Sequence, residues 1–458
     1  MKYDLVISGG KVVCPGGVRE ATVAASGCKI VGIMSADVAV EGLRTIDAAG
    51  KHVLPGGVEP HTHIGEYFPF DQDLASETRS AAAGGITTVF HYNQSTDLYR
   101  NVLRSQIEAV EGNAYVDVAY NGIINRPDHL GELEYLMENG VTSFKFFTAY
   151  KGDEGKALQQ FGCDEGALVE GFRRVKEVGG LPMVHAENQS IYLAFTPKFT
   201  HRNDLAAFSE ARPELCEDLD IRTVCRIAEY VGSDVYIVHL AYGRGIDIVE
   251  DFRRRGMKVF VETCPHYLTG DKTGEGFSEP VSLKIVPPVK GKDSQELLWK
   301  GLAVGQIQTV GCDHVCNMWE QKRGQGDIWT ALGAFPGMAT RLPLLLSQGV
   351  NRGRITIEQV ADVTSTNPAK LLGVYPRKGA IIPGADADLV IVDLNLERTV
   401  DPAQLQSAAD YSPWQGWHLR GWPTTTILRG KIVADGEGVC GERGYGEFLR
   451  TTAGTRGV

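Results

Sequence analysis

The chain has 458 residues, of which 43% are hydrophobic and 22% charged, so it can build a large core and is not a disordered protein. Its formal net charge of -11 gives no electrostatic reason to bind nucleic acid or an anionic membrane. The length favours one large domain with a smaller one, because α/β barrels commonly reach about 250 residues or more.

The start of the chain, MKYDLVISGG, lacks the apolar stretch of a secretory signal, and no run of about 18 apolar residues follows it. The nine cysteines are an odd number without CxxC spacing, which fits reduced thiols better than a disulfide framework. These features predict a cytoplasmic protein.

Both ends of the chain alternate apolar and polar residues in short runs, as strands do. YDLVISGGKVV and ATVAASGCKIVGI lie near the start, and GADADLVIVDL and TTTILRGKIVADGEGV lie near the end. We expect residues 1–50 and 378–458 to pair into one small β-sandwich domain. The final stretch YGEFLRTTAGTRGV is a C-terminal arm that contacts another subunit or frays, and fraying is more common at a terminus.

Between these ends, strand-like apolar runs alternate with segments of helical period. Eight runs are candidate strands, the number that closes a parallel barrel: residues 51–63, 85–93, 114–124, 142–149, 181–188, 234–241, 258–265 and 308–314. Amphipathic helices are clearest over residues 98–110, 165–178, 221–231 and 244–256. Residues 51–377 are therefore predicted to form a (β/α)8 TIM barrel, which makes the fold class α/β.

In such a barrel the chemistry takes place at the carboxyl ends of the strands. Metal-capable or reactive side chains lie there on five of the expected strands: His61 and His63, Lys145, His185, His239, and Asp313. Two strand residues separated by one position point to the same side, so the first pair can face one ion. A single histidine is more often structural, but this number at one mouth predicts a metal site.

Lys145 lies between Phe144 and Phe146, where burial of an ammonium group is costly and its pKa should fall. A neutral lysine amine can combine with carbon dioxide to give a carbamate, whose two oxygens can bridge two metals. The alternative is a lysine that extends from the strand end to solvent or to a salt bridge.

An ordered set of motifs along nearly the whole chain resembles the cyclic amidohydrolases, in the hydantoinase and dihydropyrimidinase branch of the amidohydrolase superfamily. The motifs include PGGVEPHTH, GVTSFKFFTAYKG, VHAEN, ETCPHYL, GCDH and STNPAKLLGVYPRKGAI. The resemblance implies two divalent metal ions, usually zinc, with manganese or cobalt as alternatives, bridged by carboxylated Lys145. It also implies the other ligands of the two ions: His61, His63 and Asp313 for one, His185 and His239 for the other.

The resemblance also implies the reaction. A hydroxide activated by the two metals attacks a ring carbonyl of a hydantoin or dihydropyrimidine, which gives an N-carbamoyl amino acid. Asp313 would pass the proton to the leaving ring nitrogen, and Tyr150 would bind substrate by donating a hydrogen bond to the oxyanion. From the sequence alone, Tyr150 is equally well explained as a packed loop aromatic. A homo-oligomer, a tetramer or a dimer, is implied as well.

Three positions depart from the family pattern. Glu59 stands where aspartate is usual, which alters positioning near the first metal. Val286 and Gly333 replace a serine and an asparagine in segments that bind substrate largely through backbone groups. These departures weaken the prediction of the substrate more than that of the reaction.

The substrate side chain and its hand depend on loops at the barrel mouth. Tyr67, Phe68 and Phe70 are candidates for an apolar wall around an aromatic substituent. The alternative is a loop that packs on its own barrel or on a neighbouring subunit.

Three other functions have the same fold. A dihydroorotase is disfavoured because Gly65 stands where that branch has arginine after the first histidine pair. An allantoinase is the main enzymatic alternative, because the motifs do not separate allantoin from other cyclic ureides. A non-catalytic dihydropyrimidinase-related scaffold is disfavoured because every predicted ligand position is filled.

Overall fold

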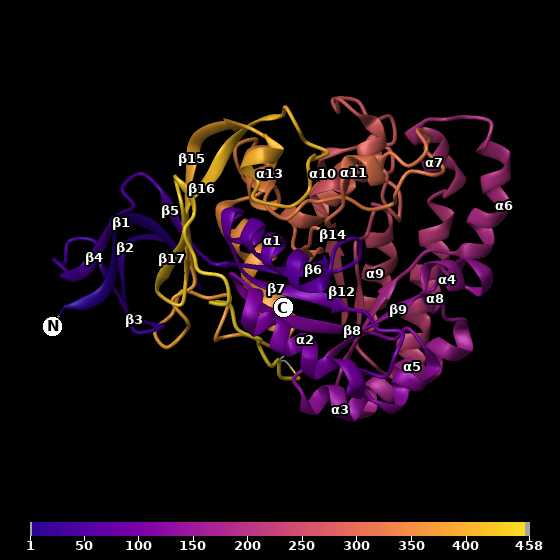
Figure 1. Ribbon diagram of the computed structural model, residues 1–458, viewed down its shortest axis with the longest axis horizontal. Coiled ribbons are helices and arrows are strands. Elements are labelled where there is room, and N and C mark those ends of the chain that lie inside the picture. Colours follow the sequence, from indigo (N-terminus) through magenta and orange to yellow (C-terminus); the bar gives the residue numbers. More distant parts are fainter. Residues whose placement is uncertain (1, 454–458) are drawn as a thin grey trace.

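The structure is a computed structural model that describes residues 2–453. A mixed sheet lies at one end of the molecule, and a parallel sheet surrounded by helices forms the rest (Figure 1). The indigo N-terminal strands lie beside the orange and yellow C-terminal strands in the mixed sheet (Figure 1). The predicted fold class, a barrel with a separate β-domain built from both ends, is confirmed. Residues 454–458, the end of the predicted C-terminal arm, lie outside the described residues.

The mixed sheet forms one continuous ladder. Its strands lie in the order β18 (Gly438–Val439), β17 (Lys431–Asp435), β16 (His418–Leu428), β15 (Leu389–Thr399), β5 (His52–Pro55), β1 (Tyr3–Cys14), β2 (Gly17–Ser26) and β3 (Lys29–Ser35), with β4 (Gly42–Asp47) paired to β1. β5 joins the two ends of the chain, since it pairs parallel with β1 and antiparallel with β15. The ladder therefore continues beyond residue 50, to Pro55.

The parallel sheet is the barrel. Its strands lie in the order β13 (Thr309–Val310), β12 (Val259–Thr263), β11 (Val235–Ile237), β10 (Leu181–His185), β9 (Ser143–Phe147), β8 (Asp117–Ile123), β7 (Ile86–Asn93), β6 (Gly57–His63) and β14 (His314–Val315). The first and last strands of this order, β13 and β14, both belong to the single run 309–315. β13 pairs with β12, and β14 pairs with β6. The sheet thus closes on itself through one split strand.

Helices cover the outside of the barrel (Figure 1). The α-helices are α1 (Phe70–Ala83), α2 (Tyr99–Asn113), α3 (Leu133–Glu138), α4 (Gly152–Leu158), α5 (Glu165–Glu177), α6 (Gln189–Phe199), α7 (Leu205–Ala211), α8 (Leu215–Val231), α9 (Gly245–Arg254), α10 (Pro265–Thr269), α11 (Lys292–Ala303), α12 (Trp319–Lys322), α13 (Arg341–Leu344), α14 (Ile357–Ala361) and α15 (Asn367–Leu371). Short 3-10 segments are Pro127–Gly131, Pro280–Leu283 and Pro402–Gln404, and π-helical segments are Leu345–Val350 and Asp362–Thr366.

The four helices predicted most clearly are α2, α5, α8 and α9. α8 begins earlier than predicted, at Leu215, where Glu217 and Asp218 in its first turn favour a helix start. Among the described residues, no helix combines the length and the apolar character needed to cross a membrane. All nine cysteines are free thiols, as their spacing predicts.

Candidate metal centre and active site

The predicted metal ligands meet at one mouth of the barrel, because the carboxyl ends of parallel strands lie at the same edge. β6, β9 and β10 carry ligands themselves, and the other ligands lie two or three residues after the ends of β11 and β13. In chain order they are His61, His63, Lys145, His185, His239 and Asp313. All of these residues are buried except His63, which is partly exposed.

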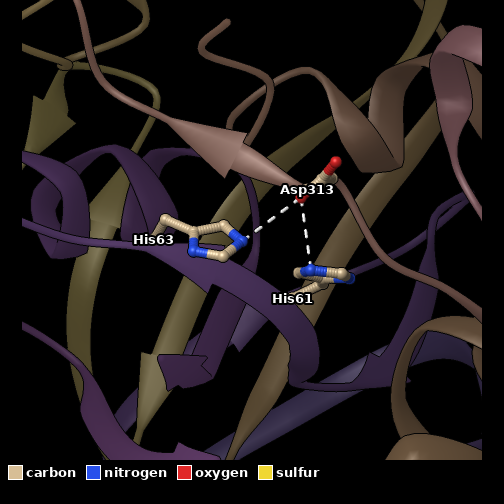
Figure 2. Close-up of side chains that lie close together, drawn as sticks. All are labelled: His61, His63 and Asp313. Atoms are coloured by element: carbon tan, nitrogen blue, oxygen red, sulfur yellow. Dashed lines mark ion pairs between the residues drawn. The ribbon is translucent and has the colours of Figure 1, made fainter. Parts of the chain in front are cut away.

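His61, His63 and Asp313 form the first of two groups (Figure 2). Oδ1 of Asp313 lies 3.2 Å from Nε2 of His61 and 3.5 Å from Nε2 of His63. Two ligand atoms of one tetrahedral zinc ion, each about 2.0–2.1 Å from the metal, lie roughly 3.3 Å apart. The observed separations therefore suit three ligands of a shared ion.

His185 and His239 form the second group, with Lys145 nearby. Nδ1 of His185 lies 2.9 Å from Nε2 of His239, a separation that also suits two ligands of one ion. The two groups adjoin, since the rings of His61 and His239 stack with centroids 5.4 Å apart. Nζ of Lys145 lies 4.7 Å from the centroid of the Tyr92 ring. Burial lowers the pKa of the Lys145 amine to about 8.

Burial also sets the protonation of the other ligands. It lowers the pKa of His61 and His185 and holds that of His239 well below the ordinary value, which favours the neutral imidazole whose lone pair can bind a metal. Burial alone would raise the pKa of Asp313, but His61 and His63 beside it hold that pKa well below its usual range. Asp313 is therefore a charged carboxylate.

Glu262, which the sequence analysis did not single out, orients His61. Its Oε1 lies 2.6 Å from Nδ1 of His61 and accepts the backbone N–H of His239 at 3.1 Å, and Tyr236 donates to its other oxygen at 2.9 Å. The carboxylate fixes the tautomer of His61 that carries Nδ1–H and leaves Nε2 for a metal. Glu262 stands inside the apolar run KVFVETCP, and a buried carboxylate needs a polar partner. That feature of the sequence could have identified Glu262 as a residue of the site.

Glu59 supports the backbone around the first group. Its Oε1 accepts the N–H groups of His61 and Cys312, both at 2.9 Å, and its Oε2 lies 3.1 Å from Nη1 of Arg341. Cys312 directly precedes Asp313. One glutamate side chain thus positions both segments that carry the first group of ligands.

Three predicted site residues have a left-handed backbone. The φ angles of Tyr150, His239 and Asp313 are 60°, 41° and 48°, in a region that residues other than glycine seldom adopt. Such a conformation costs about 1–3 kcal/mol and persists where the surrounding structure demands it, often at functional sites.

Tyr150 lies beside the second group, with its ring centroid 5.5 Å from that of His185. Burial raises the pKa of its hydroxyl, so the proton stays on the oxygen and can be donated. A hollow of about 640 Å³ opens at Tyr150 and is lined also by Arg126 and Lys156. Tyr150 therefore borders both the ring of His185 and an open hollow.

The loop aromatics take different positions. Phe70 lines a second hollow, of about 680 Å³, and its ring centroid lies 5.5 Å from that of His91. Tyr67 is exposed and Phe68 is half-buried. Of the three, Phe70 is the residue that lines this hollow.

Val286 and Gly333 contact each other. A Cβ atom added at Gly333 would lie 2.8 Å from Cγ2 of Val286, so the valine fills the side-chain space of position 333. Both residues are half-buried. The two positions are therefore direct neighbours in the structure.

Three further histidines near strand ends, His91, His266 and His314, contact other groups. Nδ1 of His91 accepts the N–H of Ile64 at 3.1 Å, and Nδ1 of His314 accepts the N–H of Gly337 at 3.0 Å. The ring of His266 packs edge-on against Phe335 at 5.0 Å.

The residues of the site fit a metal ion. Nε2 of His61 is buried and has no hydrogen-bond partner among the described residues, which is costly unless a ligand occupies it. Imidazole nitrogen and carboxylate oxygen are donors that zinc, manganese and cobalt accept in proteins. His61, His63 and Asp313 each offer a ligand atom, and these atoms lie within 4.8 Å of one another. This group can hold a metal ion.

A match to the amidohydrolase family covers residues 52–433 of the chain. The D-hydantoinase of Geobacillus stearothermophilus is 34% identical over 97% of this chain and 96% of its own length. The L-hydantoinase of Paenarthrobacter aurescens is 32% identical over 98% of each chain. The crystal structure of dihydropyrimidinase from Brevibacillus agri superposes with a TM-score of 0.90 at 30% identity and covers 100% of both chains.

The chain belongs to the amidohydrolase family. Its similarity to hydantoinases and a dihydropyrimidinase extends over the full length, which makes it a cyclic amidohydrolase, a hydrolase that acts on C–N bonds. A D-hydantoinase and an L-hydantoinase are almost equally similar, so the comparisons do not select one hand of substrate.

Proposed function

We propose that this protein opens a hydantoin or dihydropyrimidine ring by hydrolysis of a ring amide bond and releases an N-carbamoyl amino acid. The observation that carries the proposal is the pair of adjoining ligand groups at the barrel mouth, centred on Asp313 and on His185. It is supported by the full-length similarity to proteins named for these reactions.

The proposed cofactors are two divalent metal ions, with zinc as the first choice and manganese or cobalt as alternatives. When bound, they would activate a water molecule and polarise the ring carbonyl. Nζ of Lys145 would add to carbon dioxide with formation of an N–C bond and loss of a proton, and the resulting carbamate would help to hold the two ions. The lowered pKa of the buried amine favours the neutral form that this step needs.

Two residues would do the remaining chemistry. The charged carboxylate of Asp313 accepts the proton of the attacking water and gives it to the leaving ring nitrogen. The hydroxyl of Tyr150 donates a hydrogen bond to the carbonyl oxygen as negative charge develops there. Asp313 is buried and Tyr150 is half-buried, and the reduced contact with bulk water strengthens these interactions.

The substrate would be selected by the walls of the mouth. We assign the contact pair Val286 and Gly333 to the ring, and Tyr67, Phe68 and Phe70 to its substituent. If the aromatic residues form the wall, Phe70→Ala and Phe68→Ala should reduce the preference for phenyl-hydantoin over methyl-hydantoin. Unchanged discrimination would refute this role.

The test of the function is ring opening by zinc- or manganese-loaded protein. The panel comprises hydantoin, 5-substituted hydantoins of each hand, dihydrouracil, allantoin and dihydroorotate. We expect turnover of hydantoins or dihydrouracil, which also fixes the hand. Activity confined to allantoin would replace the proposal with an allantoinase, and a protein that binds no metal and opens no ring would be a scaffold.

Lys145→Ala tests the bridging carbamate. We expect loss of the bridged metal and nearly all activity while circular dichroism still reports a folded barrel. A short carboxylic acid added to the variant should restore part of the activity, because it supplies the missing pair of oxygens. A fully active variant with two bound metals would rule out the carbamate.

The resemblance to known families also motivates our proposal of a cytoplasmic homo-oligomer, a tetramer or a dimer. Light scattering coupled to size-exclusion chromatography measures the oligomeric state directly.

A further inference from the structure

Behind His185 lies a buried ion pair that the proposed reaction does not use directly. Oε2 of Glu187 lies 3.4 Å from Nε2 of His185, and the glutamate side chain is fully buried. Nη1 of Arg212, which follows α7, donates to the same oxygen at 2.5 Å. A buried carboxylate without a cation is costly, so Arg212 is what stabilises Glu187 in this place.

Glu187 determines which ring nitrogen of His185 faces the site. A neutral imidazole has one N–H and one lone pair. The carboxylate favours the N–H at Nε2, which leaves the lone pair at Nδ1, the atom that lies 2.9 Å from Nε2 of His239. The opposite tautomer would set a lone pair against the carboxylate and would remove Nδ1 as a metal ligand.

The guanidinium of Arg212 also contacts the segment that follows Tyr150. It stacks 3.8 Å from the centroid of the Tyr192 ring, and the Tyr192 hydroxyl donates to Oε2 of Glu154 at 2.5 Å. Nη2 of Arg212 lies 3.8 Å from Oε1 of Glu154. Glu154 belongs to α4, which begins at Gly152, so the same guanidinium contacts the helix that starts two residues after Tyr150.

We propose that Arg212 is a positioning residue that couples the two halves of the site. Through Glu187 it selects the tautomer of His185 that binds metal, and through Glu154 it holds Tyr150 beside that metal. The inference rests on the proposed function, because it takes His185 as a ligand and Tyr150 as the oxyanion donor.

Variants of Glu187 and Glu154 test separately the effect of Arg212 on His185 and its effect on Tyr150. Glu187→Gln removes the charge that orients His185, and we expect affinity for the second metal to fall about 10–100-fold, measured by competition with a chelator. Glu154→Gln loosens α4, and we expect a lower kcat with metal affinity unchanged. Arg212→Met should show both losses, and adding Glu187→Gln to it should weaken metal binding little further.

The tautomer of His185 can be measured in the metal-free protein, independently of enzyme activity. In the ¹⁵N spectrum of the metal-free protein, we expect His185 to carry its proton on Nε2, and Glu187→Gln and Arg212→Met should shift it toward a mixture of tautomers. Arg212→Lys, which keeps the charge but not the two-sided contact, should retain metal affinity and lose kcat. If Arg212→Met does not fold, Arg212→Lys and Glu187→Gln provide the same test.

A folded Arg212→Met with wild-type metal affinity and kcat would overturn the proposal. So would an unchanged His185 tautomer in both Arg212→Met and Glu187→Gln, because Arg212 would then only add stability. Failure of the proposed function is distinguishable: the wild-type protein itself would bind no metal or open no ring in the substrate panel.

Discussion

Two histidines of the site are oriented by carboxylates on the side of the ring away from the ligand group. Glu262 lies against His61 and Glu187 against His185, and each points to the ring nitrogen that faces away from the ligand group. Partners of this kind fix the tautomer and raise the basicity of the ligating nitrogen. The predicted strand ends identified both histidines in the sequence. Which ring nitrogen of each histidine is free to bind a metal depends on a carboxylate from elsewhere in the structure.

Glu262→Gln keeps the shape of the side chain and removes its charge. We expect metal affinity of the His61 group to fall about 10–100-fold, because the tautomer of His61 is no longer fixed. Dialysis against buffered metal, followed by metal analysis, measures the change. Glu250→Gln, which breaks an ion pair with Arg253 on α9, is the control and should bind metal normally. Equal affinities in the two variants would show that Glu262 has no such role.

At the level of elements, the eighth strand explains how Asp313 reaches the site. The run 309–315 pairs with the sheet only at its two ends, as β13 and β14. Asp313 lies in the break between them with a left-handed φ of 48°. The apolar run predicted one continuous strand there. In the structure the strand is interrupted at Asp313, because one end of the run pairs with β12 and the other with β6.

Glu59 joins this strand to β6, and Glu59→Gln tests that connection. The variant leaves the buried Arg341 without an anion, and an unpaired buried charge costs about 3–5 kcal/mol. We expect the free energy of unfolding, measured with denaturant, to fall by about that amount. The double variant Glu59→Gln/Arg341→Met should lose less than the sum of the two single changes. Strict additivity would mean that the two residues do not interact.

On the scale of the whole molecule, a buried charge cluster joins the terminal sheet to the barrel. Nζ of Lys378 lies 2.6 Å, 2.9 Å and 2.7 Å from the carboxylates of Asp117, Asp386 and Asp388. Asp117 is the first residue of barrel strand β8, and Asp388 directly precedes sheet strand β15. One lysine therefore pairs with carboxylates from both parts of the fold.

Lys378→Met should destabilise the protein strongly. It leaves three buried carboxylates with less compensation, and breaking a buried pair costs about 3–5 kcal/mol. Lys29→Met is a matched control, because Lys29 also binds Asp386 but is about half exposed, and exposed pairs contribute only about 0–1 kcal/mol. Denaturant unfolding of both variants measures the contrast, and similar losses would contradict it.

The same cluster predicts a dependence of stability on pH. Burial alone would raise the pKa of Asp386, but Lys378 and Lys29 lower it from 3.8 to about 2. A folded-state pKa below the unfolded value stabilises the protein above about pH 4, and this contribution is lost as the pH falls toward 2. The difference in Tm between the wild type and Asp386→Asn should therefore be largest above about pH 5 and shrink toward pH 3. A constant difference would argue against the shift.

The sequence by itself determined the barrel, the β-domain shared by both ends, and the set of residues at the mouth. Those features follow from local periodicity and from the rule that parallel strands end at one edge, as His61, Lys145 and His185 illustrate. Only the tertiary structure decided that Glu262 supports His61, that Val286 fills the space of Gly333, and that Arg212 connects Glu187 with Glu154. These contacts join residues far apart in the chain, and their distances depend on how whole elements pack, which no short stretch of sequence encodes.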